Sequence, residues 1–250
     1  MDYDRTNIAT SYDAGRRYSP STLAHWLNVI APWVPKRKGA EYLDLGCGTG
    51  RYSEVLAEQF GGHTVALDPS EKMLAEARKK ATDRVRYERA PGEALPLANQ
   101  SIDMVFMSMV FHHFTDPVQV VRECHRVLKP GGTVCLRAVT SNEIHSYPYV
   151  PFFARSGDIL RRTLQSREAI LSIFVDQRFR RVHYELVRSE VAPTWSAFAE
   201  KTAHRADSIL AQLSDDEFLS GMALLKQHVA SRLPQDPVIE PIDFFVFSRL

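Results

Sequence analysis

The stretch Glu41-Tyr-Leu-Asp-Leu-Gly-Cys-Gly-Thr-Gly50, followed by His63-Thr-Val-Ala-Leu-Asp68, decides the fold. An apolar strand leads into a loop with glycine at every second position, then a helix, then a second strand that ends in an acid. Glycine lacks the Cβ atom that would keep a ligand away from the backbone. The helix that begins near Arg51 directs free N–H groups into the same space. Asp68 follows the loop at the distance where a carboxylate accepts the hydroxyls of a ribose. The pattern predicts a site for a nucleoside.

The spacing of the glycines distinguishes between nucleoside ligands. Dinucleotide-binding loops follow G-x-G-x-x-G, in which the third glycine permits close packing of helix and strand. Here the third residue after Gly48 is Arg51, and the loop has the form G-x-G-x-G. Asp44 precedes the first glycine by two residues, where it can reach a cationic amine. For Asp68 a structural interpretation also stays open, namely that it caps the turn into the next helix.

Composition limits the class of protein. The 250 residues are 44% apolar and 24% charged, which is typical of a globular domain with insertions. A net charge of +1 gives no field that attracts nucleic acid, so we expect no nucleic-acid partner. The three cysteines form no C-x-x-C pair and favour a reducing compartment. Because no apolar run has membrane-spanning length and the N-terminus lacks a signal-peptide pattern, we expect a cytoplasmic protein without a membrane partner. Scattered histidines and carboxylates predict no metal site.

From Tyr42 onward, strand patterns alternate with helix patterns, which predicts a doubly wound, mostly parallel α/β sheet with helices on both faces. Seven strands are expected, at 40–45, 63–68, 84–89, 102–109, 132–139, 182–187 and 242–247. Helices are expected near 21–34, 51–60, 70–80, 117–128 and 166–179. The second strand–helix junction has Ser70 as N-cap, and Asp116 and Pro117 open the helix at 117–128.

The same patterns divide the chain into five segments. These are an N-terminal lid segment and helix (1–35), the nucleoside-binding core (36–140), an insertion with a core helix and strand (141–192), a helical cap (193–238) and a final core strand (239–250). The stretch 141–165 is expected to be irregular. A helical pair inserted between the last two strands is well placed to act as a lid. Its residues Trp195, Phe198 and Phe218 either line a pocket or pack between the two cap helices.

Several motifs together resemble the class I S-adenosylmethionine (SAM)-dependent methyltransferases, specifically the type 11 group that includes ubiquinone- and menaquinone-biosynthesis enzymes. The resemblance extends over residues 40–140. Beyond L-D-L-G-C-G-T-G, it rests on Ala66-Leu-Asp-Pro-Ser-Glu-Lys-Met-Leu74, Gly92-Glu-Ala-Leu-Pro-Leu97, Ser101-Ile-Asp-Met-Val105, Phe111-His-His-Phe114 and Arg126-Val-Leu-Lys-Pro-Gly-Gly132. It implies a Rossmann-like enzyme that moves the methyl group of SAM to a small molecule by in-line displacement and releases S-adenosylhomocysteine.

The resemblance also implies which residues bind SAM. Asp44 would lie near its amino group, Asp68 would hold the ribose, and Ser108 would face the methyl group. The remaining cofactor-binding residues would be Gly46, Gly48 and Gly50 at the methionine part, and Pro69, Met73, Gly92 and Glu93 at the adenine. Members of the family often bind the adenine amine with an aspartate. In this sequence Pro91 occupies the position of that aspartate, so the adenine contact is expected to come from Gly92 or Glu93.

Catalytic candidates lie where the strands end at their carboxyl side. His112 and His113 are candidates for a general base, or else for hydrogen bonds that fix their loop. Arg137 within an apolar strand is costly to bury without an anionic partner, which is either a substrate carboxylate or a structural ion pair. The segment from Tyr12 to Tyr18 resembles the one that folds over the active site in small-molecule methyltransferases of this group. Tyr12 and Tyr18 would stack on the substrate or the sulfonium, or merely anchor the terminus.

The expected partner is a compact, partly apolar small molecule, either aromatic or carboxylate-bearing. Two other functions stay open at this point. An NAD-dependent dehydrogenase is disfavoured because Arg51 stands in place of the third glycine. A SAM-binding protein without transferase activity would keep the same loop and the same carboxylates, so the loop alone does not distinguish it from an enzyme.

Overall fold

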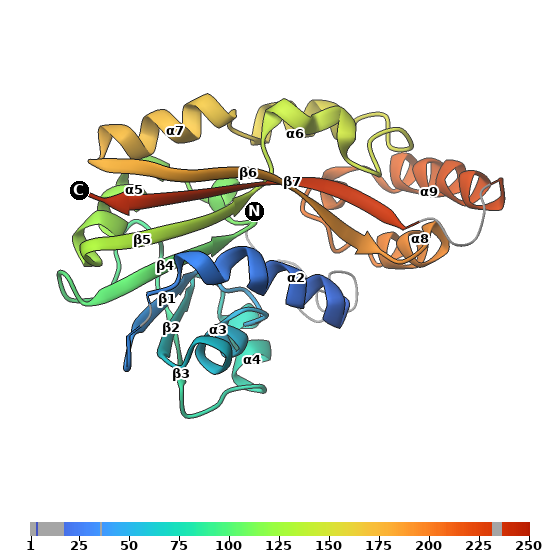
Figure 1. Cartoon of the computed structure of the whole chain (residues 1–250). Helices are drawn as coiled ribbons and strands as arrows, with labels where there is room; N and C mark the ends of the chain where they lie inside the picture. Colours follow the sequence, from blue (N-terminus) through green and yellow to red (C-terminus); the bar gives the residue numbers. More distant parts are fainter. Residues whose placement is uncertain (1–3, 5–17, 36, 232–236) are drawn as a thin grey trace.

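The computed structural model describes residues 4, 18–35, 37–231 and 237–250. Its centre is a seven-stranded sheet in the order β3-β2-β1-β4-β5-β7-β6 (Figure 1). The strands are β1 (Glu41–Leu45), β2 (His63–Asp68), β3 (Val85–Arg89), β4 (Ile102–Ser108), β5 (Leu128–Ala138), β6 (Phe179–Ala192) and β7 (Val238–Arg249). Every neighbouring pair is parallel except those that include β7, which runs antiparallel to β5 and β6. The predicted doubly wound, mostly parallel sheet is confirmed.

Helices cover both faces of this sheet (Figure 1). One face carries α2 (Pro20–Ile30), α3 (Ser53–Phe60) and α4 (Glu71–Arg78), and the other carries α5 (Pro117–Val127) and α7 (Arg167–Asp176). The alternation of side chains along β4 explains why both faces are apolar. Val105 and Met107 pack with α5 and α7, whereas Met104 and Phe106 pack with α2 and α3.

The order of the strands reverses between β1 and β4, the two central strands. From β1 the chain moves outward to β2 and β3, then returns to pair β4 with the other side of β1. In open sheets of this kind, ligands bind in the crevice beyond the carboxyl ends of the strands at that reversal. The glycine loop follows β1 directly and therefore lies at this crevice.

Local signals set the helix ends that border the crevice. Ser70 caps α4, and its side chain accepts a hydrogen bond from the Met73 backbone N–H. Asp116 caps α5 in the same way by accepting from the Gln119 N–H, and Pro117 occupies the first helical position. These caps are the predicted ones.

The segment 141–165 differs from expectation, because it is partly helical. It contains η4 (Ser141–Ser146), a 3-10 helix, and α6 (Ser156–Thr163). Ile159 and Leu160 of α6 are buried in an apolar cluster with Phe198. A helix of two turns offers only a few apolar positions, so its period cannot be recognised in the sequence. Tertiary packing, rather than pattern, determines this element.

Between β6 and β7 the chain forms the expected helical pair, α8 (Trp195–Ala203) and α9 (Asp215–Ala230), joined through η5 (Leu210–Gln212). We call these elements the cap. β6 and β7 run on beyond the end of β5 as a two-stranded ribbon, residues 187–192 and 238–242, which leads to the cap (Figure 1). The cap and α6 have an apolar core of their own, separate from the clusters on the sheet.

A buried carboxylate marks the point where the ribbon leaves the sheet. Asp243 is fully buried and accepts hydrogen bonds from the Thr140 hydroxyl (2.8 Å), the Tyr184 hydroxyl (3.0 Å) and Arg167 Nε (2.5 Å). Arg167 also donates to Glu143 of η4 at 2.5 Å. The network joins β7, β6, α7, η4 and the residues after β5. Its carboxylate is well satisfied, as a buried charge requires.

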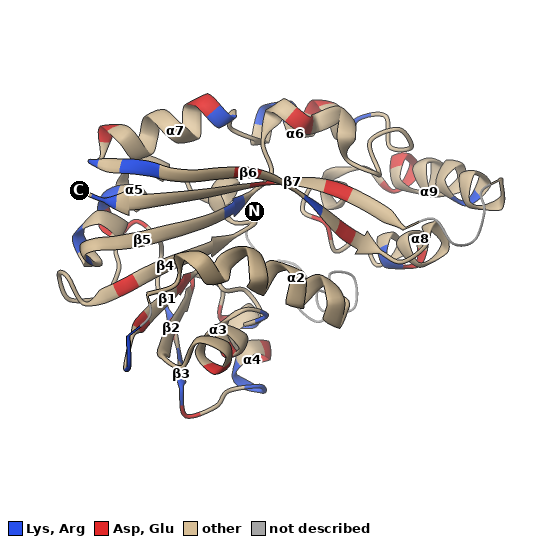
Figure 2. Ribbon diagram, in the orientation of Figure 1, with Lys and Arg blue, Asp and Glu red and all other residues tan. Residues whose placement is uncertain are grey.

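Figure 2 shows Lys and Arg interspersed with Asp and Glu over most elements, while α2 carries no charged residue. Over the described part of the chain, no helix combines the length and the apolar character needed to cross a membrane. The same residues contain no group of three or more histidines, cysteines or carboxylates placed to hold a metal ion.

Candidate functional site

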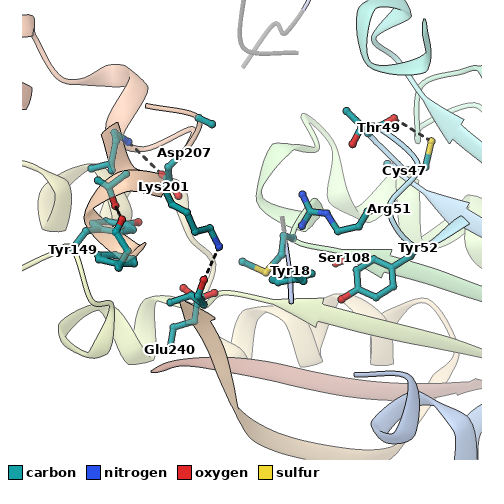
Figure 3. A pocket seen from close by; sticks show the side chains of 18 of the residues that line it. Tyr18, Cys47, Thr49, Arg51, Tyr52, Ser108, Tyr149, Lys201, Asp207 and Glu240 are labelled. Carbon is teal, nitrogen blue, oxygen red and sulfur yellow. Dashed lines mark hydrogen bonds between the residues drawn. The ribbon is translucent and has the colours of Figure 1, made fainter. Parts of the chain in front are cut away.

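A pocket of ≈ 1040 Å³, including its open mouth, lies between the glycine loop and the cap (Figure 3). Residues 46–49, 51 and 52 form one side, with Asp44 at the end of β1. The opposite side comes from the loop residue Tyr149, from α8, from the chain that leads to η5, and from β7. Tyr18 and Ser108 also line it. The pocket occupies the crevice that the strand order predicts.

The glycine loop is held against the end of β2. The backbone N–H groups of Gly46 and Cys47 donate to the Leu67 carbonyl at 2.7 and 3.0 Å. The next N–H, that of Gly48, donates to Asp68 Oδ2 at 2.9 Å. These bonds fix the loop before any ligand binds, which lowers the entropic cost of binding.

The three glycines serve two different purposes. A Cβ atom on Gly50 would lie 2.5 Å from the Tyr87 hydroxyl oxygen, and one on Gly46 would collide with Val110. Packing therefore requires glycine at these two positions. At Gly48, where φ is +55°, an added Cβ would meet no atom of the described residues within 4 Å. Because Gly48 lines the pocket, the space beside it is open to a ligand.

Asp68 ends β2 and is 8% exposed. Its Oδ2 accepts from Gly48, and its Oδ1 accepts from the Ser70 N–H at 2.9 Å. Burial raises the pKa of Asp68, while the two backbone hydrogen bonds oppose that shift. A carboxylate has about four lone-pair positions, so this residue keeps acceptor capacity for a ribose while it also holds the turn. The structural and the ligand-binding interpretations are thus compatible.

Asp44 is 2% exposed and lines the pocket below the loop. Its Oδ2 accepts a hydrogen bond from the Ser53 hydroxyl at 2.7 Å. Burial, together with the smaller effect of the charge of Asp68, raises the pKa of Asp44 to about 7, against the hydrogen bond from Ser53. A cation that entered the pocket would favour the ionised form. This carboxylate is well suited to hold an amine.

Arg137 is fully buried, and the described part of the chain does not form the structural ion pair that the sequence left open, while a substrate carboxylate as its partner stays a prediction. Within residues 4, 18–35, 37–231 and 237–250 no carboxylate lies within ion-pair distance of its guanidinium. Instead the guanidinium carbon lies 3.7 Å from the ring centroid of Trp26 and 5.2 Å from that of Tyr52. Nη1 donates to Ser108 Oγ at 2.6 Å, and Nη2 donates to the Tyr18 hydroxyl at 3.3 Å. Arg137 thus lies behind two hydroxyl groups that line the pocket.

The cap side of the pocket combines apolar and charged residues. Phe198 and Leu210 are the larger apolar side chains, and Tyr149, Lys201, Asp207 and Glu240 are polar. Lys201 and Glu240 point toward each other in Figure 3. Lys201 Nζ also donates to the Val191 carbonyl at 2.5 Å, and Asp207 Oδ1 accepts from the Ile209 N–H at 2.8 Å. Of the three aromatic cap residues considered in the sequence, only Phe198 lines the pocket.

Two of the predicted catalytic groups are not found at this pocket. His112 and His113 belong to η3 (Phe111–His113) with their ring centroids 4.0 Å apart, and neither lines the pocket. Tyr12 lies outside the described residues. A catalytic role for each of them stays a prediction.

The residues predicted for the adenine do not line this pocket: Pro69 and Met73 lie around the start of α4, and Gly92 and Glu93 lie in the loop after β3. Pro69 is exposed, Met73 is buried, and Gly92 is buried where a Cβ would lie 2.8 Å from the Phe114 ring. Glu93 Oε1 accepts from the Thr115 and Asp116 N–H groups at 3.2 and 3.3 Å. The Glu93 side chain is therefore already hydrogen-bonded to the loop before α5. The adenine contacts of these four residues stay a prediction.

The N-terminal residue Asp4 also approaches this region. Its Oδ1 accepts from the Ser70 hydroxyl at 2.6 Å and from the Lys72 N–H at 3.1 Å. These hydrogen bonds lower the pKa of Asp4. Asp4 therefore lies beside the turn that follows Asp68.

Sequence reasoning missed the polar residues of the cap wall and of the loop end, namely Thr49, Arg51, Tyr52, Tyr149, Lys201, Thr202, Asp207 and Glu240. Lys201 follows Phe198 by three positions on α8, so the face that carries Phe198 was the available signal. Glu240 belongs to the ribbon, whose extension into the cap has no local pattern.

The geometry agrees with what comparisons with known proteins show. A family model described as a methyltransferase domain matches residues 43–136. The demethylmenaquinone methyltransferase of Listeria monocytogenes serotype 4a (strain HCC23) is 36% identical over 136 residues, which cover 52% of this chain and 54% of that protein. The chain therefore spans about half the length of this curated relative.

Solved structures resemble almost the whole chain. A putative methyltransferase from an antibiotic biosynthesis pathway of Anabaena variabilis has a TM-score of 0.78 at 19% identity, covering 94% of this chain and 99% of that one. The [4+2]-cyclase SpnF has a TM-score of 0.65 at 18% identity, with coverages of 94% and 84%. Phosphoethanolamine N-methyltransferase 2 of Haemonchus contortus, with phosphomonomethylethanolamine and S-adenosylhomocysteine, has a TM-score of 0.68 at 21% identity, with coverages of 99% and 59%. At these identities the likeness establishes the fold.

Proposed function

We propose that the protein is a SAM-dependent methyltransferase that acts on a small molecule, and the match of residues 43–136 to a family model described as a methyltransferase domain supports this. The observation that carries the proposal is the open space beside Gly48, which lines the pocket together with Asp44 and donates its backbone N–H to Asp68. This space suits a ligand with an amine at one end and a ribose at the other. We include a cytoplasmic location, because Cys47, Cys124 and Cys135 are buried free thiols.

The donor fits the residues that are present. Asp44 would hold the amino group of SAM, the backbone at Gly48 would lie beneath the methionine part, and Asp68 would accept hydrogen bonds from the ribose. When bound, SAM supplies a methyl group on an already activated sulfonium. The chain must then align the acceptor with that methyl group and exclude water. Proximity and orientation of this kind can supply about 7–11 kcal/mol of the barrier.

The cap wall supports a compact acceptor with at least one polar or ionic group. Lys201 and Glu240 face the space where the acceptor would enter, beside the apolar surface of Phe198. A wholly apolar acceptor would exclude water from these charges without offering them a polar contact, which is costly. An aromatic part would lie against Phe198, and a carboxylate would be held by Lys201 rather than by Arg137. The cap lies outside residues 43–136, so the acceptor named for the relatives is not carried over.

Binding of SAM and S-adenosylhomocysteine tests the proposal, with a matched pair of variants. Gly48→Ala places a methyl group in the ligand space. Gly61→Ala introduces the same strain at a helix end, where φ is +74° and an added Cβ also meets no atom within 4 Å. We expect each variant to lose about 1 kcal/mol of stability. Only Gly48→Ala should lose affinity for S-adenosylhomocysteine, by tenfold or more in titration calorimetry.

Saturating SAM should stabilise the unchanged protein. At 100 times the dissociation constant the gain is about 2.7 kcal/mol, or roughly 5–10 °C in melting temperature for a chain of this size. NAD should give no shift, and a shift with NAD alone would favour a dehydrogenase. Labelled SAM is then incubated with a metabolite extract. Stabilisation without any transfer of label would support a SAM-binding protein that is not a transferase.

A further inference from the structure

Tyr18 lies between two guanidinium groups at the edge of the pocket. Arg137 of β5 donates to its hydroxyl oxygen at 3.3 Å, and the guanidinium carbon of Arg51 lies 4.7 Å from its ring centroid. Tyr52, at the start of α3, approaches with a ring-centroid distance of 6.3 Å. Glu240 of β7 is the carboxylate that faces this group across the pocket. Two positive charges and one negative charge thus surround the phenol.

Arg137 has a reason to need an anion. It is fully buried, its Nε has no hydrogen-bond partner among the described residues, and aromatic rings cover its planar face. A buried guanidinium without a counter-ion is costly. The groups that its amino groups contact are the hydroxyls of Ser108 and Tyr18. A phenol is much more acidic than an alcohol, so Tyr18 is the group that can supply the negative charge.

The two tyrosines beside Arg137 behave differently. Burial would raise the pKa of Tyr18, but the charges of Arg137 and Arg51 outweigh burial and the charge of Glu240, and the pKa falls below its ordinary value. For Tyr52, burial prevails and the pKa rises well above its ordinary value. Within the part of the chain that the structure describes, the hydroxyl of Tyr52 also has no hydrogen-bond partner. Only Tyr18 accepts a hydrogen bond from the guanidinium, although both residues line the pocket.

We propose that Tyr18 is the general base of the methyl transfer, and that Arg137 is the positioning residue that holds its oxygen toward the acceptor. This inference rests on the proposed function. As the acceptor's oxygen or nitrogen forms its bond to the methyl carbon with a lone pair, its proton passes to the phenolate oxygen of Tyr18. The electron pair of the broken carbon–sulfur bond stays on sulfur, which leaves S-adenosylhomocysteine and a neutral tyrosine. The tyrosine then returns its proton to water.

The proposal narrows the class of acceptor. A base is most effective when its pKa is close to that of the group it deprotonates. A phenolate can take the proton from a phenolic hydroxyl or a protonated amine. A thioether or a neutral tertiary amine has no proton on the atom that is methylated, so it needs no base. The acceptor therefore carries a weakly acidic O–H or N–H at the atom that becomes methylated.

Titration of the tyrosines in the near-ultraviolet tests this without knowledge of the acceptor. The chain has nine tyrosines, and we expect one of them to ionise at a lower pH than the rest. Tyr18→Phe should remove that first transition, whereas Tyr52→Phe should keep it. Arg137→Gln should move the transition to higher pH, and Arg137→Lys, which keeps a positive charge, should restore part of the shift.

Circular dichroism identifies any variant that does not fold. If Arg137→Gln does not fold, the comparison of Tyr18→Phe with Tyr52→Phe still shows whether Tyr18 is the residue that ionises first. If the first tyrosine ionisation is still seen in Tyr18→Phe, the proposal is overturned. It is also overturned if neither Arg137→Gln nor Arg137→Lys changes the pH of that ionisation. Binding of S-adenosylhomocysteine is measured on the same samples. Its absence would contradict the proposed function while leaving the titration of Tyr18 as a separate result.

Discussion

Asp44 shows how a single carboxyl group can make donor binding depend on pH. Its pKa of about 7 in the folded protein exceeds the ordinary value of 3.8. A carboxyl whose pKa rises on folding stabilises the protein below its unfolded pKa, and this contribution is lost as the pH rises through the folded value. Ionised Asp44 therefore lowers the stability of the ligand-free protein at neutral and alkaline pH. A cationic ligand reverses this, because it favours the ionised form.

We accordingly expect affinity for S-adenosylhomocysteine to increase with pH up to about 7, by at most roughly tenfold per pH unit. Titration calorimetry from about pH 5.5 upward would measure this, since the ligand's ammonium stays charged in that range. Asp44→Asn should bind more weakly and with a flat pH dependence. Ser53→Ala removes the hydrogen bond that opposes the shift and should move the midpoint to higher pH. An unchanged slope in Asp44→Asn would assign the pH dependence to another group.

At the scale of elements, the Asp243 network fixes the ribbon to the sheet. Replacing Asp243 by Asn should cost about 3–5 kcal/mol, because it leaves Arg167 without its fully buried partner. Glu143→Gln is the matched control, since it removes the other carboxylate of the same arginine. With about a fifth of the Glu143 side chain exposed, we expect a loss of about 1 kcal/mol or less. Urea unfolding measures both, and equal losses would mean that burial of Asp243 does not determine its contribution.

The sequence predicted the elements whose signals are local. The strands at 41–45 and 63–68 and the caps at Ser70 and Asp116 appear where alternation and capping residues placed them. β6 was expected at 182–187 but extends over Phe179–Ala192. Its outer residues, such as Arg180 and Arg188, are charged and exposed, so they lack the alternation of a buried strand. Pairing with β7 forms them into a strand, and no local pattern reports that pairing.

The residues of the candidate site likewise divide into those with a local sequence signal and those placed by tertiary packing. Asp44, Gly48 and Asp68 could be found because loop, strand end and spacing occur in one continuous segment. Arg137 was found as an unusual buried charge, but its environment of Trp26, Tyr18 and Tyr52 comes from elements far away in the chain. The cap wall depends on how α8 and the ribbon meet the core. Contacts of that kind follow from tertiary packing alone.

At the scale of the whole molecule, the sheet and the cap are two packed bodies with separate apolar cores. Trp26 Nε1 donates to Ser189 Oγ at 3.0 Å and Thr22 Oγ1 donates to the Glu190 carbonyl at 3.2 Å, so α2 also contacts the ribbon. We expect the cap to open locally at a lower free energy than the sheet. Hydrogen exchange in low concentrations of urea should therefore show faster exchange for α8 and α9 than for β1, β4 and β5. Exchange at one common rate would mean that the two bodies unfold together.

The position of β7 has a consequence for how the chain is made. β7 is the last strand in the sequence, yet it lies between β5 and β6, and Thr133 pairs with Ser248 near the C-terminus. During synthesis β5 and β6 leave the ribosome with a vacant position between them, and both present unpaired backbone edges until β7 emerges. Non-local pairing of this kind is slow and leaves nascent chains prone to aggregation. A ribosome that stops before β7 would release a chain with its glycine loop intact and its sheet unfinished.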